Sequence, residues 1–575
     1  MTPASGTLAS TRPPADPQRG ARNDPPRRPP RLSKSRLLDY LQCPKRLWLQ
    51  AHRPEAREES AAMHLAFANG HEVGEAARAL VPGGVLIDPP NNDLARALRL
   101  TRELIAARPH RPLFEATFER DGLLVRADIL LPGPDGWTLA EVKSSGAVKD
   151  YHPTDVAIQR WAMEGASAGL ALARTELWRI DTGWTYAGDG RYEGLLVRED
   201  LGEAVEARIA QVPDWVRGAK AVLAGPEPAI AMGEQCTTPF DCPFQRWCAA
   251  QAGPQPDYPV TLLPNNKGKK LAAELIAEGY ADLREVPPER IEDAELAMIA
   301  RVTREGRPRL DPEAATAIRA LAWPRIYLDF ETIGFAVPRW AGTRPYQQVP
   351  FQWACVIEHK REHKREHESG DATSGRSEQR EFLDLSGADP SRRCAEALVR
   401  ELPREGAVIA YNAQFERGVI ERLASLYPDL AKPLRSLAAR LFDLLPVVRA
   451  HYYHPDMRGS RSIKAVLPTI GAGLDHAELG EVQDGTGAQE AYLEAVSEGT
   501  GEGRKKELEE GLRRYCGMDV RGMVGLAGLL QRTRGSHSAD VERQGLARSP
   551  QACVACDSAD QDQPPTPDTS GRKLR

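Results

Sequence analysis

The sequence has few cysteines, few aromatic residues and no long apolar run. Nine cysteines among 575 residues are too few for a disulfide scaffold of this size, and an odd number leaves one unpaired. No stretch approaches the ~18 uncharged apolar residues that a membrane span requires, and the first residues contain no apolar segment of signal-peptide length. These absences argue against membrane and secreted proteins. They favour a cytoplasmic protein, in which clustered cysteines bind metal rather than cross-link.

The charge balance is nearly even. The formal net charge is −5, so the chain is not a polycation. A nucleic-acid-binding protein with this composition needs a local basic groove, and carboxylate-rich metal sites would lower its total charge. Hydrophobic residues make up 41% of the chain and charged residues 27%, as in ordinary globular proteins. The length allows about three to five domains.

Composition divides the chain into five parts. Residues 1–30 are rich in proline and arginine, and residues 534–575 contain no aromatic residue, so both are predicted to be disordered. Two ordered blocks, 31–252 and 324–533, remain. Helical periodicity in 253–323 predicts a helical connector between them.

A charged insertion interrupts the second block. Two HKRE repeats lie between the strand-like segments 351–358 and 382–387, which predicts a solvated hairpin insertion. Its histidines could bind metal, but the regular alternation of charge favours a solvated segment. The C-terminal tail holds a CxxC pair, Cys553 and Cys556, without a matching second pair, so no site is predicted there.

The first block contains two carboxylates and a lysine on adjacent predicted strands. Asp-Gly and Pro-Asp-Gly turns divide residues 112–145 into a three-stranded meander. Asp128 lies in the second strand, and Glu141 and Lys143 share one face of the third. Two carboxylates can hold a divalent cation that activates water, and a lysine can orient that water or stabilise charge on phosphorus. A salt-bridged polar strand face is the alternative explanation.

This arrangement resembles the PD-(D/E)xK nucleases. Gln159 matches the glutamine that follows Glu-x-Lys in RecB-like members, and His71 lies upstream, where that group often places a metal-binding histidine. The resemblance implies a restriction-endonuclease-type fold with Mg²⁺ or Mn²⁺ held by Asp128 and Glu141, with His71 completing the ligand set. A helix-surface histidine without a catalytic role is the alternative for His71.

Four separated cysteines flank this predicted nuclease core. Cys236, Cys242 and Cys248 are spaced with five residues in each gap, and Cys43 stands far upstream. This pattern resembles the iron–sulfur arrangement of RecB-like nucleases, including the CRISPR-associated exonucleases and the AddB-type helicase-nucleases. The resemblance implies a 4Fe–4S cluster held by the four thiolates. Zinc is the rival ligand, although structural zinc sites usually have shorter gaps between cysteines, and four buried thiols without any ligand are the third possibility.

The second block opens with two acids in an otherwise apolar strand. Asp329 and Glu331, in RIYLDFETIG, share one face of that strand. Two carboxylates so placed repel each other unless a cation lies between them. Further along the chain, Glu416 lies at a predicted helix start, and Tyr515 and Asp519 share one face of a late helix. Acids scattered without function over an α/β domain are the alternative.

The order of these motifs resembles the DEDD-type 3′–5′ exonucleases, which have an RNase H-like fold. The resemblance implies two divalent cations held by Asp329, Glu331, Glu416 and Asp519, with Tyr515 orienting the attacking water. One departure is that Glu416 stands where the family usually has aspartate. Asp443 is another acid that could contribute.

The complete motif order is similar to a bacterial family, domain-of-unknown-function family 2779. The shared motifs are DFET, YN-x-x-FE, G-S-x-S-x-K-x-V-L-P and YC-x-x-D, and the resemblance covers about residues 31–533. Glu416 then becomes a family trait. The resemblance implies the architecture and leaves the activity to be argued from the residues.

Together these patterns predict an α/β protein with two metal-dependent nuclease domains that hydrolyse phosphodiester bonds. DNA is the expected substrate and RNA the alternative, and the processing of DNA ends in repair or defence would suit such a pairing. One rival hypothesis keeps a single active domain and makes the other a nucleic-acid-binding platform. A second rival is a non-enzymatic iron–sulfur protein that binds nucleic acid.

Overall fold

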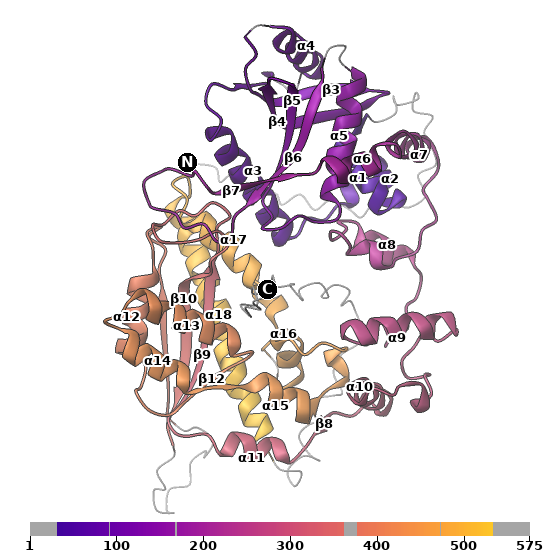
Figure 1. The fold of residues 1–575 in the computed structure, drawn as a ribbon. Helices are drawn as coiled ribbons and strands as arrows, with labels where there is room; N and C mark the ends of the chain where they lie inside the picture. Colours follow the sequence, from indigo (N-terminus) through magenta and orange to yellow (C-terminus); the bar gives the residue numbers. More distant parts are fainter. Residues whose placement is uncertain are drawn as a thin grey trace, which may run out of the picture.

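The computed structural model describes residues 31–532, apart from gaps at 91–92, 108, 167–169, 361–375 and 472. The predicted disordered arm and tail, the CxxC pair of the tail and the centre of the charged insertion lie outside the described residues. The predicted α/β class is confirmed, because helices surround two separate larger sheets (Figure 1). Within the described part of the chain, no helix is long and apolar enough to cross a membrane.

The front block is built on a seven-stranded sheet. The central strands β3, β4 and β5 form the antiparallel meander that the turn signals predict, and β6 continues parallel to β5. β1 pairs in parallel with the start of β4. The strands are β1 (Leu32–Ser33), β2 (Val85–Leu86), β3 (Leu113–Arg120), β4 (Leu123–Gly133), β5 (Gly136–Lys143), β6 (Leu172–Ile180) and β7 (Leu196–Asp200), in the spatial order β2-β3-β4-β5-β6-β7.

The helices of the front block cover this sheet and share its core. Leu37, Phe118 and Trp161 belong to one buried cluster that joins the first helix, the sheet and the crossover helix α5. This packing fixes α1 and α5 against the strands that carry the predicted acids. The helices are α1 (Lys34–Gln42), α2 (Pro44–His52), α3 (Ala61–Ala79), α4 (Leu94–Ala106), α5 (His152–Ala166), α6 (Gly202–Ile209), α7 (Val212–Ala224) and α8 (Gln245–Gln251).

The back block is built on a five-stranded sheet with the order β11-β10-β9-β12-β13. β10 is antiparallel to both β9 and β11, whereas β12 is parallel to β9 and β13 is parallel to β12. The flanks of the charged insertion therefore pair as a hairpin. The strands are β9 (Arg325–Ile333), β10 (Val349–Glu358), β11 (Ser377–Leu383), β12 (Ala407–Ala410) and β13 (Leu441–Asp443).

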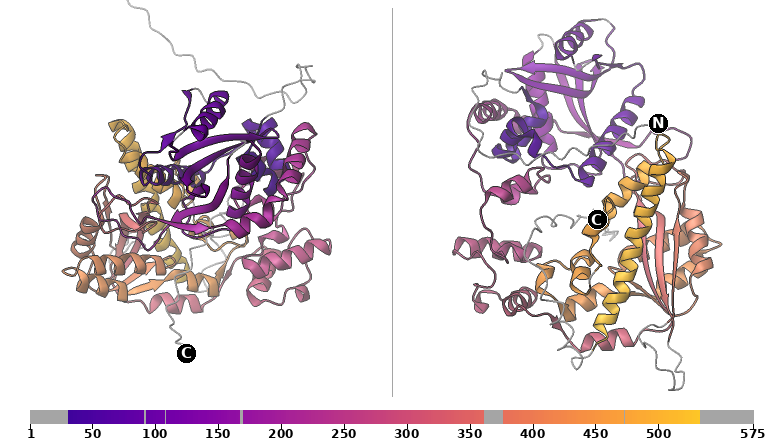
Figure 2. Two further views of the ribbon diagram at one scale, coloured as in Figure 1. Left: turned by 45° about the horizontal axis from the view of Figure 1, so that its top comes forward. Right: turned by 180° about the vertical axis from the view of Figure 1, so that it is seen from behind.

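Helices cover both faces of the back sheet. Alternate residues of β9 face opposite layers: Tyr327 packs in the cluster that contains Val520 of α18, and Leu328 packs in the cluster that contains Ile420 of α13. The long helix α18 therefore lies on the face that also carries the acids of β9 (Figure 2, right). The helices are α12 (Ser391–Glu401), α13 (Gln414–Leu426), α14 (Ala431–Ala439), α15 (Leu444–His451), α16 (Ile463–Val466), α17 (Gly485–Ala495) and α18 (Glu502–Leu530).

The predicted helical connector packs onto the back block. Leu275, Ile299 and Ile318 share one buried cluster with Tyr453 and Leu526. A short strand of the connector, β8 (Arg309–Leu310), pairs with β14 (Tyr452–Tyr453). The connector helices α9 (Asn265–Ala277), α10 (Ala294–Glu305) and α11 (Glu313–Arg319) are thus part of the back block's hydrophobic core.

The two blocks also touch directly, away from the connector. Val73 and Ile180 of the front block pack against Ala336 of the back block in one small buried cluster. Nearby, the hydroxyl of Tyr346 donates to the backbone oxygen of Ser144. Because Ser144 follows Lys143 and Tyr346 lies in the loop between β9 and β10, this contact joins segments next to both predicted centres.

Candidate functional sites

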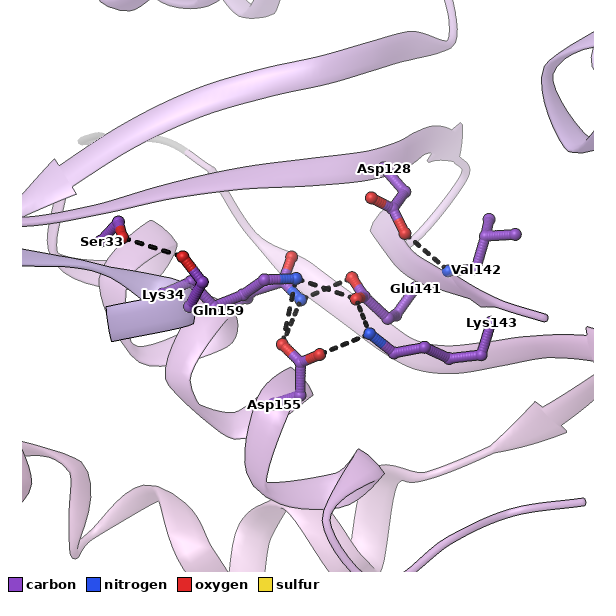
Figure 3. A network of polar contacts seen from close by, with 9 residues as sticks. Ser33, Lys34, Asp128, Glu141, Val142, Lys143, Asp155 and Gln159 are labelled. Carbon is purple, nitrogen blue, oxygen red and sulfur yellow. Dashed lines mark hydrogen bonds and ion pairs between the residues drawn. The ribbon is translucent and has the colours of Figure 1, made fainter. Parts of the chain in front are cut away.

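The predicted front residues meet where β4, β5 and α5 lie together (Figure 3). Asp128 projects from β4, and its Oδ2 accepts a hydrogen bond from the N–H of Val142 at 2.8 Å. Glu141, 1% exposed, and Lys143 project from β5, and Lys143 Nζ donates to Glu141 Oε1 at 2.6 Å. Gln159 of α5 donates to the other oxygen of Glu141 at 2.6 Å. The structure thus brings all four residues together, with Glu141, Lys143 and Gln159 in one hydrogen-bonded network and Asp128 on the neighbouring strand.

Two further residues of this network are absent from the predicted set. Lys34, at the start of α1, donates to Glu141 Oε1 at 2.8 Å and lies 3.0 Å from Asp155 Oδ1. Asp155 of α5 also accepts a hydrogen bond from Lys143 at 2.7 Å. The spacing of Asp155 and Gln159, one helical turn apart, was the available signal for Asp155. Lys34 lies 107 residues before Glu141, so no local pattern connects them.

The front network opens into a cleft of about 300 Å³. Lys34, Asp128, Glu141 and Lys143 line it, together with His71 of α3. The side chain of His71 is 73% exposed, and its Nε2 lies 3.3 Å from the carboxylate of Glu75 on the same helix. His71 therefore stands at the cleft wall with the acids, and its ion-pair partner is a neighbour on its own helix.

Burial and neighbouring charges shift the pKa values of the acids at this site. Burial and the charge of Glu141 raise the pKa of Asp128 to about 7. Burial opposes ionisation of Asp155, but Lys143 and Lys34 outweigh it and hold the pKa of Asp155 far below its ordinary value. The site therefore has two acids paired with ammonium groups, Glu141 and Asp155, and a third acid, Asp128, whose hydrogen bond comes from a backbone N–H. A divalent cation beside Asp128 would supply further positive charge.

The four predicted cysteines line one small cavity. Cys43, the residue between α1 and α2, is buried, and the other three come from the segment that ends in α8. Lys45 and Arg46 line the same cavity, so positive charge lies beside the sulfurs. The lining cysteines are Cys43, Cys236, Cys242 and Cys248. In the described part of the chain, no three of these sulfurs lie within 4.8 Å of one another.

The second group of acids meets between β9 and α18. The ligand atoms of Asp329 and Glu331 and the sulfur of Cys516 all lie within 4.8 Å of one another. Asp519 and Tyr515, both 5% exposed, lie on the same helix as Cys516. Asp329, Glu331, Asp519 and Tyr515 belong to the predicted set. Cys516 does not, although it directly follows Tyr515 in the sequence.

Glu416 lies close to this group. It occupies the first turn of α13 and is 3% exposed. Burial, and next the charge of Asp329, raise the pKa of Glu416 well above its ordinary value. Its Oε2 is buried without a hydrogen-bond partner. A buried carboxylate oxygen without a hydrogen-bond partner, beside another carboxylate, could ligate a cation.

The remaining acids also repel one another. Burial raises the pKa of Asp329 well above its ordinary value, and Asp519 raises it further. Burial, Asp329 and Asp519 do the same to Glu331. Burial and Glu331 raise the pKa of Tyr515, so its phenol stays protonated as a hydrogen-bond donor. All four predicted acids and the tyrosine thus share one low-dielectric, electronegative site.

Two other side chains define this site further. His476, 4% exposed, holds Asp519 through a 2.7 Å contact between Nε2 and Oδ1, a partner that sequence reasoning missed. Asp443 instead accepts hydrogen bonds from the N–H groups of Asn412 and Leu445, both at 2.9 Å, and caps α15. Asp443 therefore serves as a helix cap, and Glu416 is the acid that faces Asp329.

The comparison with known families covers part of the back block. Residues 326–462 match the family described as domain of unknown function DUF2779. The matched segment contains Asp329, Glu331 and Glu416 but ends before Tyr515 and Asp519. The finding supports the resemblance drawn from the motifs and says nothing of activity, because the family's function is unknown.

A curated relative is similarly uncharacterised. The chain is 24% identical over 215 residues to the "Uncharacterized protein MG366 homolog" of Mycoplasma pneumoniae (strain ATCC 29342 / M129 / Subtype 1). The match covers 35% of this chain and 31% of that protein, so the chain spans about a third of its relative.

Proposed function

We propose that the chain is a metal-dependent nuclease with two centres that hydrolyse phosphodiester bonds, in DNA or, alternatively, in RNA. The observation that carries the proposal is the convergence of four acids and Tyr515 from β9, α13 and α18, with Asp329 partly buried and the other three acids buried. These acids come from three separate segments of the chain, and a cation between them would relieve their mutual repulsion. The order and directions of the back strands, three antiparallel followed by two parallel, support an RNase H-like exonuclease domain.

In the back centre, Asp329, Glu331, Glu416 and Asp519 would hold the cations. Divalent ions bound there would lower the pKa of water and neutralise charge on the leaving oxygen. Tyr515 would orient the attacking water through its protonated hydroxyl, since its raised pKa makes it a poor base. His476 would fix the carboxylate of Asp519 in the orientation that ligation requires.

In the front centre, Asp128 and Glu141 would hold a cation, and Lys143 would act on the water and the phosphate. Gln159 fixes the orientation of Glu141 by donating to the oxygen that the lysines leave free. This arrangement supports a RecB-like PD-(D/E)xK nuclease, which is the front half of the proposal.

We infer a 4Fe–4S cluster rather than a single zinc ion in the four-cysteine cavity, because five residues lie in each gap between Cys236, Cys242 and Cys248. Four thiolates at 2.3 Å from one zinc would place their sulfurs about 3.8 Å apart. The sulfurs of Cys43, Cys236, Cys242 and Cys248 share a cavity, yet no described trio of them lies within 4.8 Å. In a cluster each thiolate binds a different iron, so its sulfurs stand farther apart than those around one zinc ion. Lys45 and Arg46 would offset its negative charge.

Replacing Cys43 by serine is expected to remove the cluster and destabilise the front block. Cys43 is the ligand that ties α1 and α2 to the distant cysteine segment, and binding energy at such a site is also folding energy. The measurements are iron and sulfide content, visible absorbance of an anaerobic preparation, and the melting temperature. The matched control is Cys394→Ser, which alters a buried thiol outside the cavity. One zinc per chain and no iron would refute the cluster.

The whole proposal is tested by cleavage of labelled single-stranded and duplex DNA and RNA. Each acid set is disabled separately, with Mg²⁺ or Mn²⁺ present and with a chelator as control. If cleavage is lost when one acid set is disabled but not when the other is, the half whose acids are not needed is a binding platform. Absence of hydrolysis with every ion would favour the non-enzymatic alternative.

Tyr515→Phe is expected to reduce exonuclease turnover by about 100-fold without weakening binding of Mn²⁺. The phenyl ring keeps the packing but cannot hydrogen-bond to water. Single-turnover kinetics on a labelled strand, with the front centre disabled, measure the rate. Tyr492→Phe, which alters another buried tyrosine of the back block, is the control. An unchanged rate would remove Tyr515 from the catalytic group.

A further inference from the structure

A second lysine faces the front cleft, and the Asp…Glu-x-Lys pattern does not include it. Lys34 is 20% exposed in its side chain and lines the cleft together with Lys143. Its ammonium group lies 2.8 Å from Glu141 Oε1, the same oxygen that accepts from Lys143 at 2.6 Å. Two ammonium groups thus converge on one carboxylate oxygen at the cleft wall.

The backbone holds Lys34 in this position from both sides. Just before it, Leu32 pairs with Leu123 of β4, the strand that carries Asp128. Ser33 caps α1 by accepting from the N–H of Arg36, and Leu37 is fully buried in the front core. The first turn of α1, which begins at Lys34, is therefore held against the sheet that carries Asp128 and Glu141.

Asp155 contacts both lysines and keeps their ammonium groups apart. It is 1% exposed, and its two oxygens separate their partners: Oδ1 lies 3.0 Å from Lys34 Nζ, and Oδ2 lies 2.7 Å from Lys143 Nζ (Figure 3). Asp155 does not line the cleft, whereas both lysines do. Asp155 thus holds the ammonium groups of Lys34 and Lys143 side by side at the wall of the cleft.

The formal charges indicate what those cations would bind. Asp128, Glu141 and Asp155 contribute three negative charges, and the two lysines contribute two positive charges. A divalent ion would change the net charge of this group from minus one to plus one, which matches one phosphodiester. Without Lys34 the loaded group would be neutral, and Lys143 and Arg78 would be left as the basic side chains of the cleft wall.

We propose that Lys34 is a second catalytic lysine of the front centre, which binds a non-bridging oxygen of the scissile phosphate while Lys143 acts on the water. This assignment rests on the proposed nuclease function of the same site. Asp155 is the positioning residue that holds the two ammonium groups apart.

The test uses the full chain with the back centre disabled by Asp329→Ala. In this background we expect Lys34→Met to reduce single-turnover cleavage of labelled DNA by about 100-fold. Affinity for inorganic phosphate in the presence of Mn²⁺ should fall. Affinity for Mn²⁺ alone should rise by about tenfold, because a positive charge has left the ion's surroundings. Calorimetric titration measures both affinities without reference to activity.

Two variants make the result specific. Arg36→Met removes a positive charge from the same helix, where the guanidinium donates to Arg31 O, and should change none of these quantities. Lys34→Arg keeps the charge and should retain part of the phosphate affinity. Cleavage and phosphate binding by Lys34→Met at the parent level would overturn the assignment. Lower affinity for Mn²⁺ together with a lower melting temperature would also overturn it, because it indicates a structural role.

The nuclease proposal can fail separately. The parent protein could show no cleavage of any substrate, while its Mn²⁺-dependent binding of phosphate still requires Lys34. In that case the proposed hydrolysis is wrong, and Lys34 remains the anion-binding residue of this cleft.

Discussion

Asp329→Asn is expected to abolish the activity of the back centre and, in the absence of divalent ions, to stabilise the protein. Asp329 lies in the field of both Glu416 and Asp519, and it shares a potential ligand set with Glu331. Asparagine has the same shape and no charge, so it relieves the repulsion and removes a metal ligand. With the front centre disabled by Lys143→Ala, we expect turnover to fall by about 1,000-fold or more.

The stabilisation should depend on pH in a defined direction. Burial and Asp519 raise the pKa of Asp329 well above its ordinary value of 3.8, so the folded protein holds this proton more tightly than the unfolded chain. Stability conferred by this group is therefore lost as pH rises from about 4 toward the raised pKa. Asp329→Asn lacks that loss of stability. Its melting temperature should therefore exceed that of the parent protein by more at pH 7 than at pH 4.

Melting temperatures in a chelator at several pH values measure this effect. A gain of about 2–4 °C at pH 7 corresponds to about 1 kcal/mol for a domain of this size. Asp456→Asn, which removes an exposed carboxylate outside the cluster, should show neither effect. A destabilised Asp329→Asn variant would mean that the acids are already compensated by protein groups, and the metal site would be refuted.

Local patterns predicted the elements that carry the acids. The turn signals of the front meander and the Asp-x-Glu pair in an apolar strand are short-range features, and the structure contains the corresponding strands β4, β5 and β9. The four-residue spacing placed Tyr515 and Asp519 on one face of α18 for the same reason. Periodicity determines which face a residue occupies, and that information lies within a few neighbours.

Other members of both sites depend on long-range packing. Lys34 reaches Glu141 across 107 residues, and His476 reaches Asp519 across 43 residues. Neither residue lies in a recurring spacing, so only the folded sheet brings it to its partner. The connector illustrates the same limit. Its amphipathic helices were predicted, but an apolar face does not specify the surface that will cover it, here the core around Tyr453.

Lys143→Ala is expected to remove turnover of the front centre while leaving its affinity for Mn²⁺ intact or higher. Lys143 contacts Glu141 and Asp155 but would act on water and phosphate rather than hold the ion. Lys34 still neutralises both acids in the variant, so the fold of the site should survive. In a background that carries Asp329→Ala, we expect cleavage to fall by about 1,000-fold.

The control for this experiment is Lys149→Ala, which alters an exposed lysine outside the network. Mn²⁺ titration and cleavage of a labelled strand should both remain at the parent level in that variant. Undiminished cleavage by Lys143→Ala would defeat the assignment of the front centre. A loss of Mn²⁺ affinity equal to the loss of cleavage would show that the lysine organises the ligands. In that case Lys143 is a positioning residue that fixes the carboxylates of Glu141 and Asp155, to which its ammonium group donates.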